Sequence, residues 1–145
     1  MSLDSTQNGY AHAKFTYHFW RPVTAIRNGD RDDNDATERD PSWMPLNTTP
    51  MHPEYPSQAA IVAGVSARVL ELVVPSAQSV PVTATDLVDP TKKRQFASIN
   101  ELSDEQCNVR VWGGIHFRSD VVVGKALGKA VAQKVIDYAQ NDGSQ

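Results

Sequence analysis

Residues 110–135 read RVWGGIHFRSDVVVGKALGKAVAQKV, and this stretch decides the fold. In its second half, apolar residues recur at the 3.6-residue period of an amphipathic helix. The two glycines near its start break the helix that precedes them, because glycine destabilises a helix interior. His116 therefore stands near the beginning of a new helix, and Asp120 lies one turn further along.

Start and stop signals elsewhere in the chain predict more helices. Ser57 and Ser98 are natural N-cap residues, and Ser98 forms a capping box with Glu101. The expected helices cover residues 11–20, 23–27, 57–74, 98–112 and about 116–140, and residues 79–85 and 95–97 form a short hairpin. A long polar loop over residues 30–55 precedes the Ser57 helix. The predicted fold class is all-α, with one short β-hairpin.

The composition of the chain argues against some classes of binding partner. The chain has 145 residues, of which 40% are hydrophobic and 21% charged, as in an ordinary soluble globular domain. A net charge of -3 without a basic stripe argues against a nucleic-acid partner. No run reaches the roughly 18 apolar residues that a membrane span needs, and no signal peptide is visible, so the compartment stays open. Cys107 is the single cysteine, and we interpret it as a small buried residue.

Two cations near the N-terminus are candidates for an anion site. Lys14 and Arg21 are seven residues apart, so on one continuous helix both would project from the same face. Aromatic residues surround them, which predicts burial, and a buried cation needs a carboxylate or an anionic ligand. From the spacing alone, two solvated surface cations are the alternative.

A second group of candidates surrounds the glycine pair. Arg110 lies before it and His116 after it, with Asp120 placed to orient the imidazole. Ser57 begins a helix, and the free N–H groups at a helix start form a ready anion site. The alternatives are a core histidine with hydrogen-bond partners, an acid that only stabilises its helix N-terminus, and a serine that only caps.

These residues fall into a known pattern. Lys14 to Pro22 reads K-x6-R-P, Arg110 to Asp120 reads R-x5-H-x3-D, and a Tyr-Pro-Ser sequence ends at Ser57 between them. This order resembles the three-part signature of vanadium-dependent haloperoxidases and type 2 phosphatidic-acid phosphatases. The flanking stretches KFTYHFWRPVTAIRNGD, HPEYPS and VWGGIHFRSD are similar to bacterial members of the haloperoxidase-related branch. The resemblance implies a helical bundle of the haloperoxidase and acid-phosphatase type.

The resemblance also implies a role for each matching residue. Lys14, Arg21 and Arg110 would hold the equatorial oxygens of vanadate or phosphate, with help from the Ser57 hydroxyl and the Gln58 amide. His116 would be the vanadium ligand in a peroxidase or the nucleophile in a phosphatase, and Asp120 would support it. Vanadate is the expected cofactor, with phosphate as an alternative occupant and no divalent metal. The aspartates of residues 30–35 lack the glycine and glutamate of a calcium loop.

Two positions depart from the family pattern. The middle motif of the family continues Ser-Gly-His, whereas this chain has Gln58 and Ala59 after Ser57. In the family, that histidine handles the proton of the leaving group or of the apical oxygen, and an alanine can do neither. General acid–base assistance is worth roughly 10²–10⁴-fold, so its loss predicts a weak enzyme with an intact fold.

A histidine from elsewhere in the chain can replace the lost one. Lys14, His18 and Arg21 stand at positions i, i+4 and i+7, so we expect all three side chains to share one helix face. If Lys14 and Arg21 point at the anion, His18 lies close to the same pocket. His52, in the loop before the middle motif, is the rival candidate. The alternative for His18 is simple packing among its aromatic neighbours.

The family's catalytic domain has further helices before the first motif. The chain is therefore predicted to be a single domain, residues 1–145, that forms the C-terminal portion of a larger catalytic domain or completes its core by pairing. An apolar face left open predicts a homodimer. Three functions stay open: halide oxidation by hydrogen peroxide with bound vanadate, phosphate-ester hydrolysis through a phosphohistidine, and a catalytically impaired anion-binding or structural module.

Overall fold

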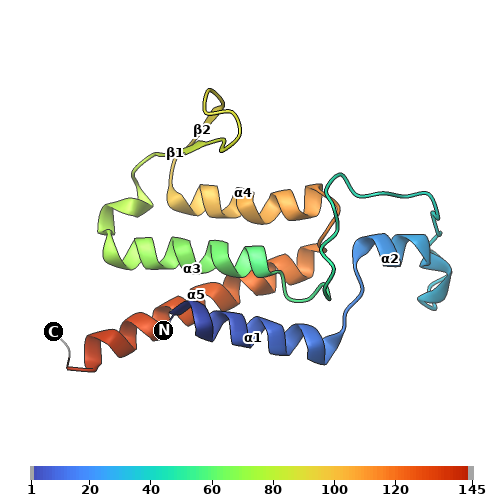
Figure 1. The fold of residues 1–145 in the computed structure, drawn as a ribbon, viewed down its shortest axis with the longest axis horizontal. Coiled ribbons are helices and arrows are strands. Elements are labelled where there is room, and N and C mark those ends of the chain that lie inside the picture. Colours follow the sequence, from blue (N-terminus) through green and yellow to red (C-terminus); the bar gives the residue numbers. More distant parts are fainter. Residues whose placement is uncertain (1, 144–145) are drawn as a thin grey trace.

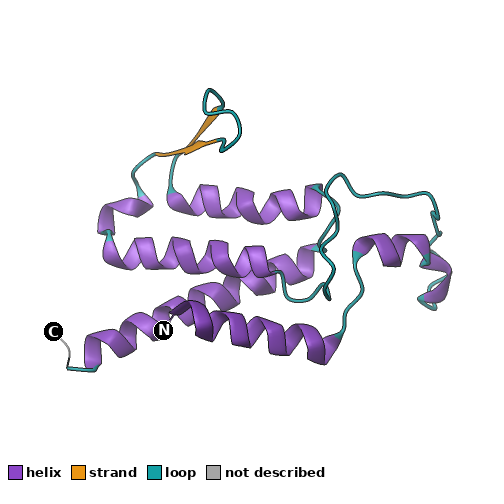
Figure 2. Ribbon diagram, viewed as in Figure 1, coloured by secondary structure: helices purple, strands orange, loops and turns teal. Residues whose placement is uncertain are grey.

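The computed structural model describes residues 2–143. Its elements in chain order are α1 (Ser2–Tyr17), α2 (Pro22–Arg27), η1 (Gly29–Arg31), α3 (Gln58–Val73), η2 (Pro75–Gln78), β1 (Val82–Thr85), β2 (Lys93–Phe96), α4 (Ile99–Trp112) and α5 (Arg118–Asn141) (Figure 1). Helices dominate and the two strands form one antiparallel hairpin (Figure 2), so the predicted fold class is confirmed.

The bundle is built on α3, α4 and α5. Helix α3 lies beside both α4 and α5, and α1 packs against α5 (Figure 1). Small residues fill the centre of the packing: Ala60, Ala63, Cys107 and Val121 form one buried cluster. Cys107 is thus the small buried residue that the sequence predicted.

Helices α3 and α5 touch backbone to backbone along a glycine seam. A β-carbon on Gly128 would stand 2.1 Å from the carbonyl oxygen of Ile61, and one on Gly64 would stand 2.3 Å from that of Lys125. Real side chains do not tolerate such distances, so only glycine lets the two helices approach this closely. The seam fixes the separation of the two helix starts that carry the site.

The predicted helix caps are present. The Ser57 hydroxyl accepts a hydrogen bond from the backbone N–H of Ala60, and the Ser98 hydroxyl accepts one from that of Glu101. The carboxylate of Glu101 reaches back to the N–H of Ala97, one residue before the cap. These bonds satisfy donors that a helix start leaves free, which explains why α3 and α4 begin where they do.

The first helix is shorter than predicted at its C-terminal end. It stops at Tyr17 instead of reaching Trp20, and His18 has a positive φ of 48°. Arg21 is the extended N-cap of α2, with φ -80° and ψ 155°. Proline disfavours the helical conformation in the residue before it, so Pro22 excludes a helix that runs through Arg21. The prediction that Lys14, His18 and Arg21 share one helix face is therefore wrong.

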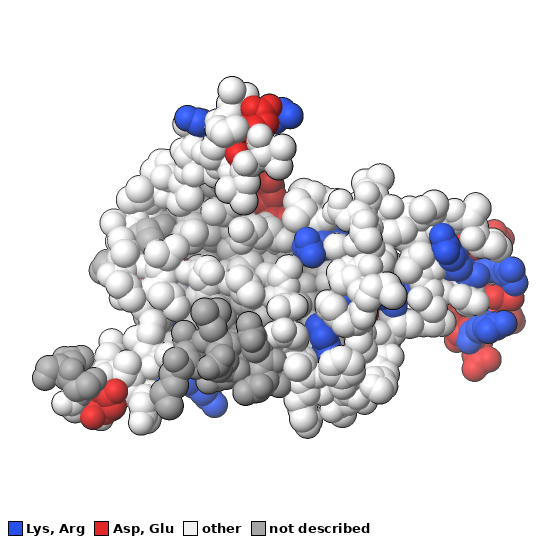
Figure 3. All heavy atoms as spheres, in the orientation of Figure 1, with Lys and Arg blue, Asp and Glu red and all other residues white. Residues whose placement is uncertain are grey.

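The loop between η1 and α3 crosses the end of the bundle where α4 stops and α5 starts (Figure 1). Backbone bonds attach it there: Asn47 N–H donates to Gly113 and Glu54 N–H donates to Phe19. Charged side chains gather instead on the hairpin and around α2 and η1 (Figure 3). Among the described residues, no helix is both long and apolar enough to cross a membrane.

Candidate oxyanion site

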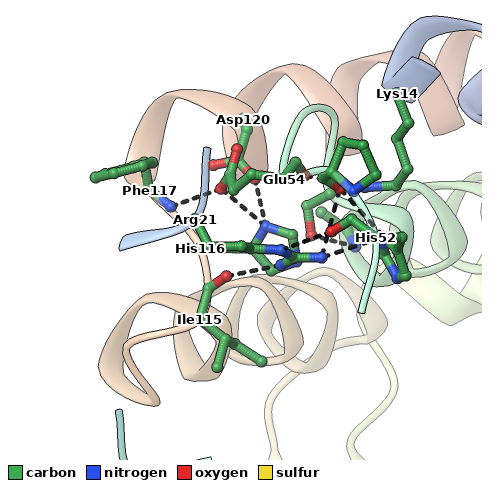
Figure 4. A network of polar contacts seen from close by, with 11 residues as sticks. Lys14, Arg21, His52, Glu54, Ile115, His116, Phe117 and Asp120 are labelled. Atoms are coloured by element: carbon green, nitrogen blue, oxygen red, sulfur yellow. Dashed lines mark hydrogen bonds and ion pairs between the residues drawn. The ribbon is translucent and has the colours of Figure 1, made fainter. Parts of the chain in front are cut away.

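His116 is the centre of a buried polar network at this end of the bundle (Figure 4). Its Nδ1 lies 2.6 Å from Asp120 Oδ2 and 2.9 Å from Glu54 Oε1, and its Nε2 lies 3.1 Å from Nη1 of Arg21. Arginine has donors only, so Nε2 must be the acceptor in its contact. The ring proton therefore sits on Nδ1, between the carboxylates, and the lone pair of Nε2 faces Arg21.

Glu54 is the functional residue that the sequence analysis missed. Its side chain is fully buried, and Oε1 accepts a further hydrogen bond of 2.9 Å from the backbone N–H of Phe117. Burial raises the pKa of this carboxyl, and neighbouring Asp120 adds to the increase. Charge balance could have identified it. Three buried or half-buried cations need more negative charge nearby than the single carboxylate of Asp120 supplies.

Lys14 anchors the loop behind His116. Its side chain is 1% exposed, and Nζ donates to the carbonyls of Pro53 and Glu54 at 2.7 and 3.0 Å. Burial, followed by the charge of Arg21, lowers the pKa of Lys14 to about 8. The ammonium has three N–H groups, so one remains for a further acceptor.

Arg21 connects the loop to the turn before α5. Its Nε and both terminal nitrogens contact the carbonyls of His52, Pro53 and Ile115 and the ring nitrogens of His52 and His116. Burial lowers the pKa of this guanidinium, and the charge of Arg110 acts in the same direction. Carbonyl dipoles and the two buried carboxylates compensate the charge.

A strained turn places His116 beside Arg110. Gly114 has φ 73°, and a β-carbon there would stand 2.9 Å from the ring of Trp43. Both conditions favour glycine. The backbone N–H groups of Ile115 and His116 then donate to the carbonyl of Arg110, each at 3.2 Å.

A cavity of about 520 Å³ opens in front of His116. Its lining comes from the loop, α3 and α4: Pro50, His52, Gln58, Ala59, Val62, Ala63, Gln106, Val109, Arg110 and His116. The Nε atom of Arg110 is buried and has no hydrogen-bond partner among the described residues. Lys14, Arg21 and Ser57 are outside this lining and support the loop and helices that form it.

Residues 4–143 match the family described as the VCPO second helical-bundle domain. The chain belongs to this family. A bacterial vanadium-dependent iodoperoxidase of known structure is 29% identical to it, with a TM-score of 0.72 over 86% of this chain and 28% of that one. Holo and apo structures of a bacterial vanadium-dependent chloroperoxidase share the fold at 21% and 20% identity, with TM-scores of 0.70 and 0.73. They are covered over 32% and 34% of their length, and 90% and 94% of this chain.

This member of the VCPO second-bundle family therefore spans about a third of the length of the solved structures that it resembles. None of the curated proteins matches its sequence closely enough to count as a relative. The family assignment and the helical haloperoxidase fold agree with the resemblance seen in the motifs.

The side chains present fit an oxyanion such as vanadate. The buried Nε of Arg110 needs an acceptor, and His116, whose Nε2 accepts from Arg21, lines the same cavity. Gln58 stands where the family motif has glycine, and its side chain lines this cavity. The donor set is therefore suited to a tetrahedral anion, with one bulky departure.

The same network contains the one group among the described residues whose donor atoms gather as a metal site requires. Glu54, His116 and Asp120 offer ligand atoms within 4.8 Å of one another. The Nδ1 proton of His116 and the N–H of Phe117 use Asp120 Oδ2 and Glu54 Oε1 as acceptors, and the second oxygen of each carboxylate has no hydrogen-bond partner among the described residues. We therefore interpret the cluster as hydrogen-bonded support for the imidazole.

The two remaining histidine candidates lie in different places. His18 is exposed, and its ring contacts Phe15 edge-on with centroids 6.2 Å apart. His52 is half-buried, lines the cavity beside Ala59 and contacts Arg21. The loop histidine thus reaches the site that His18 was expected to reach.

Proposed function

We propose that the domain binds a vanadate- or phosphate-like oxyanion in this cavity and acts as the catalytic part of a haloperoxidase. The observation that carries the proposal is the state of His116, whose proton is held at Nδ1 and whose Nε2 lone pair is directed to Arg21. A ligand nitrogen or nucleophile needs this tautomer. Bound vanadate would supply the chemistry by which hydrogen peroxide oxidises a halide.

The protein's own groups would bind the anion, orient it and neutralise its charge. Arg110 would donate to the oxygens of the anion, and Arg21 and Lys14 would add positive charge from behind the cavity wall. Asp120 and Glu54 would hold the imidazole in place and stabilise positive charge that develops on it. Fixed cations around a five-coordinate, negatively charged centre stabilise it without reorganisation at the moment of reaction.

Hydrolysis of a phosphate ester through phospho-His116 is the second candidate, because the same lone pair can attack phosphorus and the same cations suit its equatorial oxygens. The third candidate is an impaired anion-binding module. Ala59 favours it, since no polar side chain from that position lines the cavity.

One experiment tests the shared core of these candidates. Orthovanadate at millimolar concentration should raise the melting temperature of the chain by mass action. The activity arm combines orthovanadate, peroxide and bromide in one assay and a chromogenic phosphate ester in another. A melting temperature that does not move with orthovanadate or phosphate contradicts all three candidates.

Association into a homodimer stays a prediction. Exposed apolar side chains lie on the two helices expected near the contact: Phe15 on α1 is 60% exposed, and Val122 on α5 is 58% exposed. Light scattering should report a dimer that Val122→Lys weakens. A well-folded monomer at high concentration would contradict the prediction.

A further inference from the structure

We propose that His52 is the acid–base residue of this site and does the work of the histidine that Ala59 replaces. The inference rests on the proposed oxyanion function and adds to it the group that moves a proton on the cavity side of the anion. Three observations support it: the position of His52, its hydrogen-bond partners, and the small number of titratable side chains that line the cavity.

The composition of the cavity leaves few alternatives. Of the side chains that line it, only those of His52, Arg110 and His116 titrate. Arginine keeps its proton in proteins, so Arg110 cannot act as acid or base. His116 is held at Nδ1 by two carboxylates, and its Nε2 is the atom proposed to bind the anion. His52 is the titratable group that remains.

The partners of His52 leave its outer nitrogen free for a ligand. Its Nδ1 lies 3.2 Å from Nη2 of Arg21 and 3.1 Å from the carbonyl oxygen of Pro53. The hydrogen bonds that His52 makes within residues 2–143 use Nδ1 and the backbone oxygen. With Nδ1–H donating to the carbonyl oxygen of Pro53, Nε2 can lose its proton to the leaving group and regain one from water while Nδ1 stays protonated. The ring can therefore change charge without a rotation, because its contact at Nδ1 is the same in both states and His52 lines the cavity.

The charges around His52 set its proton affinity. Burial lowers the pKa of His52, the hydrogen bond to Pro53 raises it, and Lys14, Arg21 and His116 lower it further. Arg110 lines the same cavity from α4, and Glu54 follows two residues later in the loop. A bound anion adds negative charge and raises the proton affinity of the ring, so His52 gains its proton when substrate binds.

The proton movements balance in the ester reaction. His116 Nε2 forms a bond to phosphorus while the bond from phosphorus to the ester oxygen breaks, and that oxygen leaves with the proton of His52 Nε2. In the second step His52 takes a proton from water. The water oxygen then bonds to phosphorus, and the electron pair of the broken phosphorus–nitrogen bond returns to His116.

The first test does not depend on turnover. Imidazole resonances of the ¹⁵N-histidine-labelled chain are followed at fixed pH as inorganic phosphate is added. The signals of His52 and His116 should move and the pKa of His52 should rise, whereas exposed His12 should stay unchanged. If His116 responds and His52 does not, the proposal for His52 is wrong while anion binding stands. If neither responds, the proposed function itself fails.

The second test uses the chromogenic ester. His52→Gln should lower kcat by about 10²–10⁴-fold with little change in KM, and His12→Gln should change neither. Adding Ala59→His to His52→Gln should restore at least tenfold. A phosphate-induced rise in melting temperature shows that each variant is folded and binds. Full turnover in His52→Gln, or no restoration by Ala59→His, would overturn the proposal.

Discussion

The two sides of the His116 ring differ in kind. On the carboxylate side, which is Glu54 and Asp120, both contacts with the ring are short and buried, and the second oxygen of each carboxylate is buried without a hydrogen-bond partner among the described residues. On the cavity side, which is His52, Gln58, Ala59 and Arg110, the side chains are partly exposed, and the buried Nε of Arg110 has no hydrogen-bond partner within the part of the chain that the structure describes. One set of residues thus supports the imidazole, and another set faces the ligand. Substitutions on the carboxylate side should lower stability, and substitutions on the cavity side should weaken ligand binding.

The largest effect should come from breaking the carboxylate side. Glu54→Ala leaves the Phe117 N–H and part of the His116 contact without an acceptor in a buried site. A buried donor left without an acceptor costs about 1–3 kcal/mol, and two are affected, which denaturant unfolding would measure. Exposed Glu38→Ala should change the free energy of unfolding by less than about 0.5 kcal/mol. Equal losses in both variants would contradict a special role for Glu54.

Breaking the cavity side should affect binding instead. Arg110→Ala removes a charge-assisted donor worth about 1.5–3 kcal/mol, so the rise in melting temperature induced by orthovanadate should disappear while the apo protein stays folded. Arg21→Ala should lose both the shift and stability, because Arg21 joins the loop at His52 to the turn at Ile115 and His116. Exposed Lys134→Ala is the control. Retention of the shift in both arginine variants would place the ligand elsewhere.

Restoring the family motif should sharpen the comparison. The double variant Gln58→Gly with Ala59→His should raise phosphatase or bromoperoxidase activity by at least about tenfold, or 1.4 kcal/mol in barrier height. Initial rates of both reactions measure it. No gain would mean that further groups of the site are missing as well.

A smaller effect should appear with pH, through Lys14. Sulfate keeps its charge over the range, so sulfate affinity should fall severalfold as pH rises through about 8, where Lys14 loses its proton. Without the anion, the stability of the chain shows the opposite trend and increases with pH. The unfolded chain keeps this proton until about 10.5, so between these values it binds more protons and the free energy of unfolding rises with pH. Lys14→Met should remove both trends, measured by calorimetry and urea unfolding.

The smallest effect is expected at His18. Its side chain is exposed and lies outside α1, so His18→Gln should change stability by less than about 0.5 kcal/mol and leave ligand binding and the pH profile intact. Thermal scans with and without orthovanadate across pH 5 to 8 would check this. A loss of anion binding in His18→Gln would contradict the placement of this side chain.

The sequence predicted the helices that carry strong local signals. Ser57 and Ser98 cap as expected, and the α5 pattern was sufficient to place His116 at its start. The end of α1 was mispredicted because an aromatic-rich run carries no stop signal, and the effect of Pro22 on Arg21 was underweighted. Motif spacing found the cations that cluster around His116, but no local pattern marks which loop side chains fold back onto the imidazole. Glu54 and His52 are 62 and 64 positions away from it, and such pairings are set by tertiary packing.

The glycine seam has a mechanical consequence for the site. A β-carbon on Gly124, near the first turn of α5, would stand 2.7 Å from the carbonyl oxygen of Ser57, at the same end as the bond from Ser57 N–H to the carbonyl of Asp120. Because α3 and α5 are in backbone contact, a methyl group at Gly128 would push them apart there and change the angle between them. That change would move their ends at Ser57 and Asp120 relative to each other. The lack of side chains at Gly64, Gly124 and Gly128 thus sets the distance between α3 and α5, and with it the width of the bundle end beside His116.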